Sequence, residues 1–182
     1  MQLDLKTGLI DTARQQASPN CDERPDASDI SLIVIHAISL PPGEFGGSGI
    51  DELFTNQLDP EEHPYYQDIF KLEVSSHLLI RRDGELVQYV PLHRRAWHAG
   101  QSSYQNRDCC NDFSIGIELE GTDELPYETR QYDVLNQLID LLCASYERLD
   151  RGSIVGHCDI AAGRKTDPGE SFDWQAIAVE RP

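Results

Sequence analysis

Three residues of this sequence carry side chains that could bind one metal ion together. His36 directly follows the apolar run 31–35. His157 follows a shorter apolar run, 153–156, and Asp167 lies ten residues further along the chain. Imidazole nitrogens and a carboxylate oxygen suit Zn²⁺, and three protein ligands leave a fourth position open for water, as in catalytic zinc sites. The two histidines could instead belong to a core, because neither HExxH nor a zinc-finger spacing is present.

Two further residues could do chemistry beside such an ion. Segment 113–120 alternates, so that Glu118 and Glu120 share one face while the opposite face is apolar. A carboxylate shielded from water beside a metal-bound water is a suitable general base. The same face could also be an outer face exposed to solvent. Lys165 alternates with Asp167, so both could face one site from an extended loop, where the ammonium would stabilise an oxyanion.

Aromatic side chains in a glycine-bounded loop could line the same site. Trp97 and His98 come shortly before Gly100, and aromatic faces pack well against carbohydrate rings. Trp97 could equally be a core residue. A different chemistry would use Cys158 as a nucleophile beside His157. We disfavour it, because neighbouring side chains on a strand point to opposite faces.

Strand and helix patterns alternate along the chain and would position these residues. Strands are predicted at 31–35, 74–80, 85–90, 113–120 and 153–156. Asp83 and Gly84 are a strong turn signal and make the second and third of these a hairpin. Helices are predicted at 50–58, 60–71 and 128–149, and a short one from about Phe172.

This alternation predicts an α/β fold of the mixed α+β kind. We expect one mixed sheet of about five to six strands flanked by helices. Residues 1–30 are polar and carry turn formers, so we expect an irregular arm that packs on a single domain spanning 1–182.

Composition excludes several classes of function. The chain has 182 residues, and its 15 Lys and Arg against 32 Asp and Glu give a net charge of −17. This charge argues against non-specific binding of nucleic acid and against electrostatic attachment to anionic membranes. No apolar stretch approaches the roughly 20 residues of a membrane span. We expect a monomer whose partner is a small molecule.

The cysteines and the N-terminal residues predict a cytoplasmic protein. The five cysteines are an odd number without CxxC spacing, and we expect free thiols in a reducing compartment. Residues 1–16 lack a basic segment followed by an apolar one, so no secretory signal is expected.

Five motifs stand out along the chain: HAISLPPGEFGG, HLLIRRDGELVQYVP, RAWHAG, NDFSIGIELEGTD and GHCDIAAGRKTDPG. In this order they resemble the motifs of the zinc-dependent anhydro-N-acetylmuramyl-L-alanine amidases. That family shares its fold with the peptidoglycan recognition proteins. The similarity runs from about residue 8 to the C-terminus, and five long motifs are far more specific than the His/His/Asp set alone.

The resemblance implies roles for the residues singled out above. It implies that His36, His157 and Asp167 bind Zn²⁺, that Glu118 accepts a proton, and that Lys165 stabilises the transition state. The implied reaction cleaves the amide between the lactyl group of anhydro-N-acetylmuramic acid and the L-alanine of the stem peptide. Such a reaction recycles soluble fragments of the cell wall.

Three positions depart from the family's pattern. Ala37 stands where Asn is usual, and Glu73 and Cys109 stand where basic residues are usual. The metal ligands and the catalytic pair are intact, so the departures concern how an anionic stem peptide is held. Because a net charge of −17 would repel a carboxylate-bearing substrate, local cations must offset it. We assign Arg107 to that role.

The alternative function is a non-catalytic module that binds peptidoglycan fragments. Relatives that only bind usually lack a zinc ligand, whereas all three ligand positions are filled here. A third reading, an amidase of the polymeric cell wall, would require export.

Overall fold

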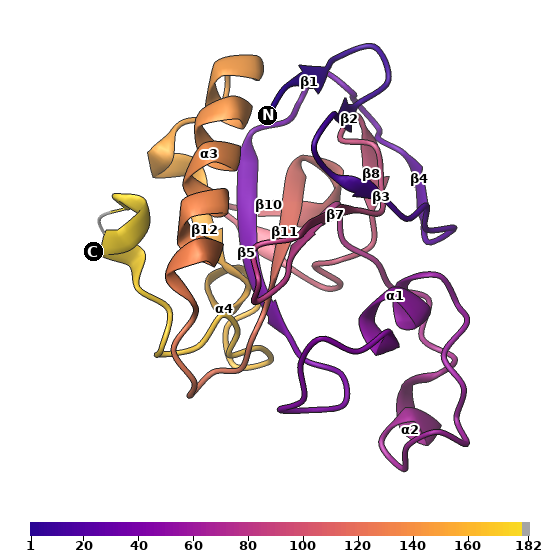
Figure 1. Ribbon diagram of the computed structural model, residues 1–182. Coiled ribbons are helices and arrows are strands. Elements are labelled where there is room, and N and C mark those ends of the chain that lie inside the picture. The colour runs from indigo at the N-terminus through magenta and orange to yellow at the C-terminus, as the bar shows by residue number, and fades with distance from the viewer. Residues whose placement is uncertain (180–182) are drawn as a thin grey trace.

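Six strands form the central sheet of the computed structural model, which describes residues 1–179 (Figure 1). In order across the sheet they are β12 (Ile154–Gly156), β5 (Leu32–Ile38), β11 (Ser114–Glu120), β6 (Leu78–Ile80), β7 (Leu86–Gln88) and β3 (Arg14–Gln15). Neighbouring strands run parallel except for β6 and β7, which form the predicted antiparallel hairpin. The predicted mixed α/β fold is confirmed.

Helices lie on both faces of the sheet. They are α1 (Gly49–Phe54), α2 (Tyr66–Ile69), α3 (Thr129–Ser145) and α4 (His157–Ile160), with 3₁₀ turns at Cys110–Asp112, Arg151–Ser153 and Trp174–Ile177. Figure 1 shows α3 on one side of β5, with α1 and α2 on the other. Leu78 and Ile80 accordingly pack in the core that includes α3, whereas Leu79 packs in the core that includes α1. None of the helices within residues 1–179 is long and apolar enough to cross a membrane.

Three helices are shorter than their spacing predicts, and α3, predicted at 128–149, ends at Ser145. The helix predicted at 50–58 ends at Phe54, and Asn56 just beyond it has a left-handed backbone with φ of +59°. The helix predicted at 60–71 is reduced to Tyr66–Ile69, because Pro64 disfavours helical geometry in the residue before it.

The first 30 residues contain short strands that the predicted irregular arm did not include, although turns and loops make up the rest of the segment. They form four short strands, β1 (Leu3–Asp4), β2 (Leu9–Ile10), β3 and β4 (Cys21–Glu23). β3 extends the central sheet at β7, and β4 pairs with β8 (Arg94–Ala96). The buried Arg24 donates hydrogen bonds to the carbonyls of Asp112 and Ser114. These partners are remote in sequence, and strands of two or three residues have no readable periodicity.

The register of the parallel strands brings the predicted site residues to one edge of the sheet. Glu118 of β11 lies opposite His36 of β5. Gly156 ends β12 opposite Ile35, so His157 begins α4 beside His36. This is the edge formed by the carboxyl ends of parallel strands, where α/β proteins commonly bind ligands.

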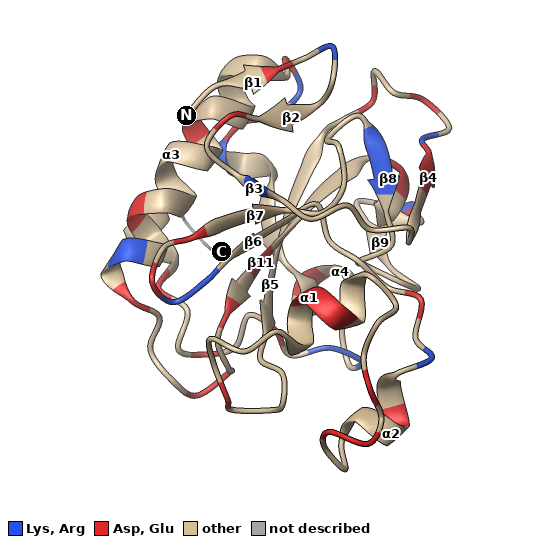
Figure 2. Cartoon of the chain, turned by 45° about the vertical axis from the view of Figure 1, so that its right-hand side comes forward, with Lys and Arg blue, Asp and Glu red and all other residues tan. Residues whose placement is uncertain are grey.

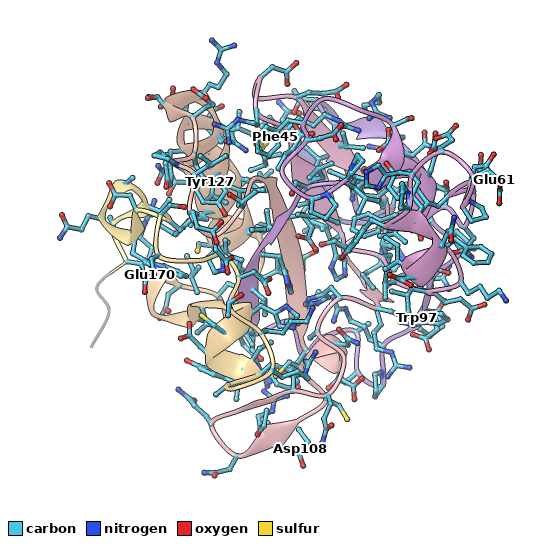
Figure 3. The ribbon with its side chains drawn as sticks, turned by 90° about the horizontal axis from the view of Figure 1, so that it is seen from below. Phe45, Glu61, Trp97, Asp108, Tyr127 and Glu170 are labelled. Atoms are coloured by element: carbon cyan, nitrogen blue, oxygen red, sulfur yellow. The ribbon has the colours of Figure 1, made fainter. Side chains whose placement is uncertain are left out.

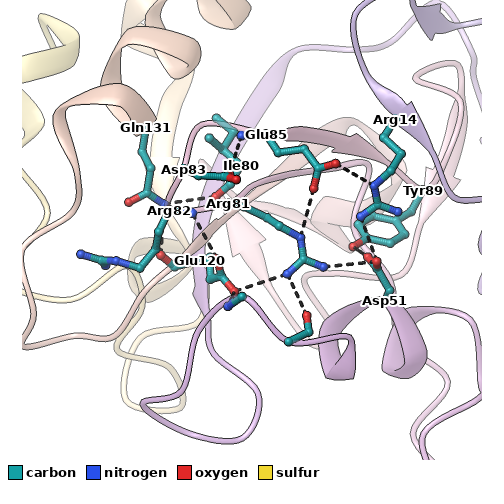
Figure 4. A network of polar contacts seen from close by, with 12 residues as sticks. Arg14, Asp51, Ile80, Arg81, Arg82, Asp83, Glu85, Tyr89, Glu120 and Gln131 are labelled. Carbon is teal, nitrogen blue, oxygen red and sulfur yellow. Dashed lines mark hydrogen bonds and ion pairs between the residues drawn. The ribbon is translucent and has the colours of Figure 1, made fainter.

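A buried ion-pair network fixes the loop that follows β5 (Figure 4). The guanidinium of Arg81 lies 3.4 Å from Glu120 Oε1 and 3.2 Å from Asp51 Oδ2, and it donates to the carbonyl of Gly47 at 3.0 Å. Glu120 is 2% exposed, and it also accepts the backbone N–H of Gly46 at 2.7 Å. The network therefore ties the segment 46–51 to the last residue of β11.

Removing the carboxylate of Glu120 should destabilise the fold. Glu120→Ala leaves the buried Arg81 with one partner fewer, and it removes the acceptor of the Gly46 N–H. The expected loss in the free energy of unfolding is about 3 kcal/mol, measured by urea denaturation. The exposed Glu147→Ala is the control and should change it by less than about 0.5 kcal/mol. A loss for Glu120→Ala no larger than that of the control would contradict this account of the network.

Candidate metal centre and active site

The three predicted metal ligands converge on one point. Nδ1 of His36 lies 3.0 Å from Nδ1 of His157, and each of these nitrogens lies 3.1 Å from Oδ2 of Asp167. Both imidazoles are buried, and the carboxylate side chain is 15% exposed. The donor atoms thus form a nearly equilateral triangle from which most water is excluded.

This triangle fits Zn²⁺. Two ligands bound at about 2.0–2.1 Å in a tetrahedral arrangement lie about 3.3 Å apart, close to the observed spacing. Burial lowers the pKa of His36 to about 4, so its ring is neutral and its lone pair is available at neutral pH. Burial acts to raise the pKa of Asp167, but hydrogen bonds with His157 and His36 outweigh it and hold that pKa below its usual value.

The ring nitrogens on the far side of both histidines also have partners. Nε2 of His36 lies 2.9 Å from Nδ1 of His98, and Nε2 of His157 lies 3.2 Å from the carbonyl oxygen of Ala99. Partners of this kind hold a histidine ligand in one tautomer and one orientation.

Glu118 lies beside the three ligands and lines the same pocket. Its side chain is 7% exposed, and Oε2 has no hydrogen-bond partner among the residues that the structure describes. Burial raises the pKa of Glu118 well above its usual value, the charge of Asp167 raises it further, and the charge of Lys165 lowers it. A buried carboxylate with an unpaired oxygen is suited to take a proton from a water.

Lys165 reaches the same pocket from an exposed loop that is held at several points. Its backbone N–H donates to the carbonyl of Ala161 at 3.1 Å. Arg164 donates to the carbonyls of Ala99 and Gln101, at 2.8 and 2.7 Å. The loop that carries Lys165 and Asp167 is therefore fastened to the segment that also contacts the ligand histidines.

These residues line a pocket of about 710 Å³. One wall is mainly apolar and is formed by Leu53, Phe54, Tyr65, Ile69, Leu72, Val74 and Trp97. The other wall is polar and is formed by Thr122, Asp123, Glu124 and Lys165. Seen from below, Trp97 lies on the side of the molecule that carries α1 and α2, and Tyr127 lies on the side of α3 (Figure 3).

The structure brings seven of the eight predicted site residues to this pocket. They are His36, Trp97, His98, Glu118, His157, Lys165 and Asp167. His98 does more than form a wall, because its ring packs edge-on against His36 with 5.0 Å between ring centroids.

Arg107 is the predicted site residue that the structure does not bring to the pocket. It lies on β10 (Arg107–Asp108), which pairs with β9 (Ser103–Tyr104) away from the ligands. Its guanidinium donates to Asp29 at 2.5 Å and to Ser31 Oγ at 3.1 Å, and it lies 3.7 Å from the centroid of the Phe113 ring. These contacts are near the start of β5, whereas His36 is near its end.

Several other arginines also form ion pairs within the fold. Arg94 and Arg95 on β8 pair with Glu23 and Asp22 on β4, visible as facing blue and red strands in Figure 2. Arg82 pairs with Glu128 at 2.7 Å. Among the described residues that line the pocket, Lys165 is the only lysine or arginine.

Of the three departures from the family pattern, only Ala37 lines the pocket. Glu73 and Cys109 are exposed. Sequence reasoning missed Gly116, where a Cβ atom would lie 2.6 Å from the ring of His98. A glycine within an otherwise apolar strand is a signal of such close approach.

Comparisons with known proteins agree with this geometry. The sequence pattern of the N-acetylmuramoyl-L-alanine amidases matches residues 26–170. The 1,6-anhydro-N-acetylmuramyl-L-alanine amidase AmpD of Citrobacter freundii is 58% identical over 170 residues, which cover 93% of this chain and 90% of that protein. A crystal structure of a selenomethionine derivative of AmpD superimposes with a TM-score of 0.94 at 56% identity, covering 97% of both chains.

A more distant structure contains a ligand. It is the amidase AmiD of E. coli in complex with the substrate anhydro-N-acetylmuramic acid-L-Ala-D-γ-Glu-L-Lys. It is 29% identical, with a TM-score of 0.59, and the match covers 97% of this chain and 64% of that chain. The resemblance seen in the five motifs is therefore confirmed, and the chain belongs to the N-acetylmuramoyl-L-alanine amidase family.

Proposed function

We propose that this protein is a zinc-dependent 1,6-anhydro-N-acetylmuramyl-L-alanine amidase. Its reaction hydrolyses the amide between the lactyl group of anhydro-N-acetylmuramic acid and the L-alanine of the stem peptide. The observation that carries the proposal is the triangle of His36, His157 and Asp167 beside the unpaired oxygen of Glu118, in one pocket. The 58% identity to AmpD of C. freundii supports the choice of substrate.

Zn²⁺ held by His36, His157 and Asp167 would polarise the scissile carbonyl and lower the pKa of a water. Glu118 accepts the proton of the attacking water through its unpaired oxygen and delivers it to the departing amine of L-alanine. Lys165 places a positive charge beside the carbonyl oxygen, where negative charge develops as the tetrahedral state forms.

The two walls of the pocket would contact different parts of the substrate. Trp97 and the apolar wall present a surface suited to the sugar ring. Lys165 is the only lysine or arginine of this lining among the described residues, so the lining offers the stem peptide no lysine or arginine apart from the one assigned to the scissile carbonyl.

The proposal includes the setting in which the enzyme acts. We place it in the cytoplasm, as a monomer with one amidase domain over 1–182 that acts on soluble muropeptides in cell-wall recycling. None of the five cysteines forms a disulfide within the described residues, which is typical of a reducing compartment.

Incubation with purified anhydro-N-acetylmuramyl tripeptide tests the activity. Mass spectrometry should detect free anhydro-N-acetylmuramic acid and a tripeptide with a new N-terminal alanine. Binding without cleavage by the zinc-loaded protein would favour the non-catalytic module. Faster release from isolated cell-wall polymer than from the soluble fragment would favour an amidase of the polymeric wall.

The purified protein should contain about one zinc per chain, because three ligands from separate segments meet at one point. Asp167→Ala removes one ligand, so both bound zinc and activity should fall. Elemental analysis after dialysis measures the metal. The exposed Asp108→Ala is the control and should keep both; an Asp167→Ala protein with full zinc content would refute the ligand assignment.

Glu118→Ala and Lys165→Ala should keep zinc and a similar KM while kcat falls by about 10²- to 10³-fold, because both groups act on the transition state. The losses should be less than additive in the double variant, since the two groups serve one transition state. Steady-state kinetics measure the effect, with Lys6→Ala as the matched control. A Lys165→Ala enzyme with near-normal kcat would exclude the proposed role of Lys165.

The pH dependence of kcat/KM should also reflect the interaction between Glu118 and Lys165. Glu118 must be ionised to accept a proton, so kcat/KM falls as the pH drops through its raised pKa. Lys165 lowers that pKa, and Lys165→Met should therefore move the acidic limb of the profile to higher pH. Profiles of the two enzymes under identical conditions provide the measurement. A limb that stays in place or moves to lower pH would contradict the coupling.

A further inference from the structure

We propose that His98 and the carbonyl of Ala99 are positioning groups that hold the two histidine ligands in the tautomer needed for metal binding. The inference rests on the proposed zinc site. Two consecutive residues of one short segment contact the outer nitrogens of both ligand rings. The segment therefore sets the direction in which both Nδ1 atoms point.

A chain of hydrogen bonds defines the tautomer of His36. Its Nδ1 faces His157 and Asp167, so a metal bound there leaves the ring proton on Nε2. Nε2–H then donates to Nδ1 of His98 at 2.9 Å. His98 in turn carries its own proton on Nε2 and donates it to Ser114 Oγ at 3.1 Å. Each donor in this series has one acceptor.

The chain ends on the backbone. The Ser114 hydroxyl donates to the carbonyl of Cys110 at 2.5 Å, and Ser114 is fully buried. A carbonyl can only accept, so the direction of every proton in the series is fixed from this end. The series of hydrogen bonds runs from the carbonyl of Cys110 through Ser114 and His98 to His36.

The second ligand is held by the neighbouring residue. Nε2 of His157 lies 3.2 Å from the carbonyl oxygen of Ala99, which requires the proton on Nε2 and leaves Nδ1 for the metal. Arg164 donates to the same carbonyl at 2.8 Å and to the carbonyl of Gln101 at 2.7 Å. The position of the Ala99 carbonyl is thus set independently of the histidine.

The backbone of this segment is itself fixed. Asn111 Oδ1 accepts the N–H groups of His98 and Ala99, at 3.1 and 2.8 Å. Trp97 N–H donates to Ser75 Oγ at 3.1 Å. The missing side chain of Gly116 leaves room for the His98 ring. The position of the His98 ring is therefore fixed by its backbone and by the space beside Gly116.

Removal of the His98 acceptor should weaken zinc binding. In His98→Ala and His98→Phe, the buried N–H of His36 would have no partner when Nδ1 binds the metal. We expect the Kd for Zn²⁺ to rise about 10- to 100-fold, the range typical of lost outer partners of metal ligands. His98→Asn keeps an acceptor near the position of Nδ1 and should recover most of the affinity. A merely structural role would not distinguish Asn from Phe.

The experiment measures the Kd for Zn²⁺ by competition with a chromophoric chelator, at one pH and without substrate. Ser114→Ala tests the chain without altering any histidine, and it should weaken binding about five- to tenfold, as expected for one lost hydrogen bond. His63→Ala is the matched control, since it removes a histidine outside the pocket. Circular dichroism of the metal-free proteins verifies that each variant is folded.

Nitrogen-15 NMR of the zinc-loaded protein gives a second readout. The His36 ring should show its proton on Nε2 in the wild type and in His98→Asn, and a loss of that single state in His98→Phe. Wild-type affinity in both His98→Phe and Ser114→Ala would overturn the positioning role while leaving the zinc site intact. A wild-type protein that binds no zinc would instead overturn the proposed metal site itself.

Discussion

Two imidazole nitrogens and one carboxylate oxygen lie within 3.1 Å of one another in a site nearly closed to water. Lone pairs brought this close together in a low-dielectric setting repel one another unless a proton or a metal cation lies between them. The pairing of β5 with β11 and β12 brings the site residues on or next to these strands together. That pairing sets His36 opposite Glu118 and delivers His157 to the same edge.

The parts of the site that sequence could predict are those tied to local patterns. His36 and His157 stand at or near the ends of apolar runs, and the strand alternation of 113–120 distinguishes Glu118 from its apolar neighbours. Residues at the carboxyl ends of neighbouring parallel strands lie at the same edge of the sheet. A pattern read locally in the sequence therefore predicted which residues lie close together. The central strands and α3 followed from their hydrophobic periodicity, and the hairpin followed from the turn signal of Asp83 and Gly84.

The parts that sequence could not predict depend on contacts between distant segments. Arg107 looked available for a substrate carboxylate, but Asp29, 78 residues away in the chain, binds its guanidinium. His98 looked like a wall residue, and its contact with His36 spans 62 residues. Nothing in the local sequence of either residue encodes the partner. The two- and three-residue strands of the N-terminal segment escaped prediction for the same reason.

The distribution of charge shows how the protein separates stability from substrate recognition. Arg81, Arg94 and Arg95 are committed to carboxylates that hold strands and loops together. Acidic residues lie on α1, α2 and α3, drawn in red in Figure 2. An anionic substrate therefore approaches a molecule of negative net charge, and Lys165 is the only lysine or arginine among the described residues that line the pocket. In the proposed mechanism Lys165 acts beside the scissile bond, so electrostatic attraction is concentrated where the transition state forms rather than along the rest of the substrate.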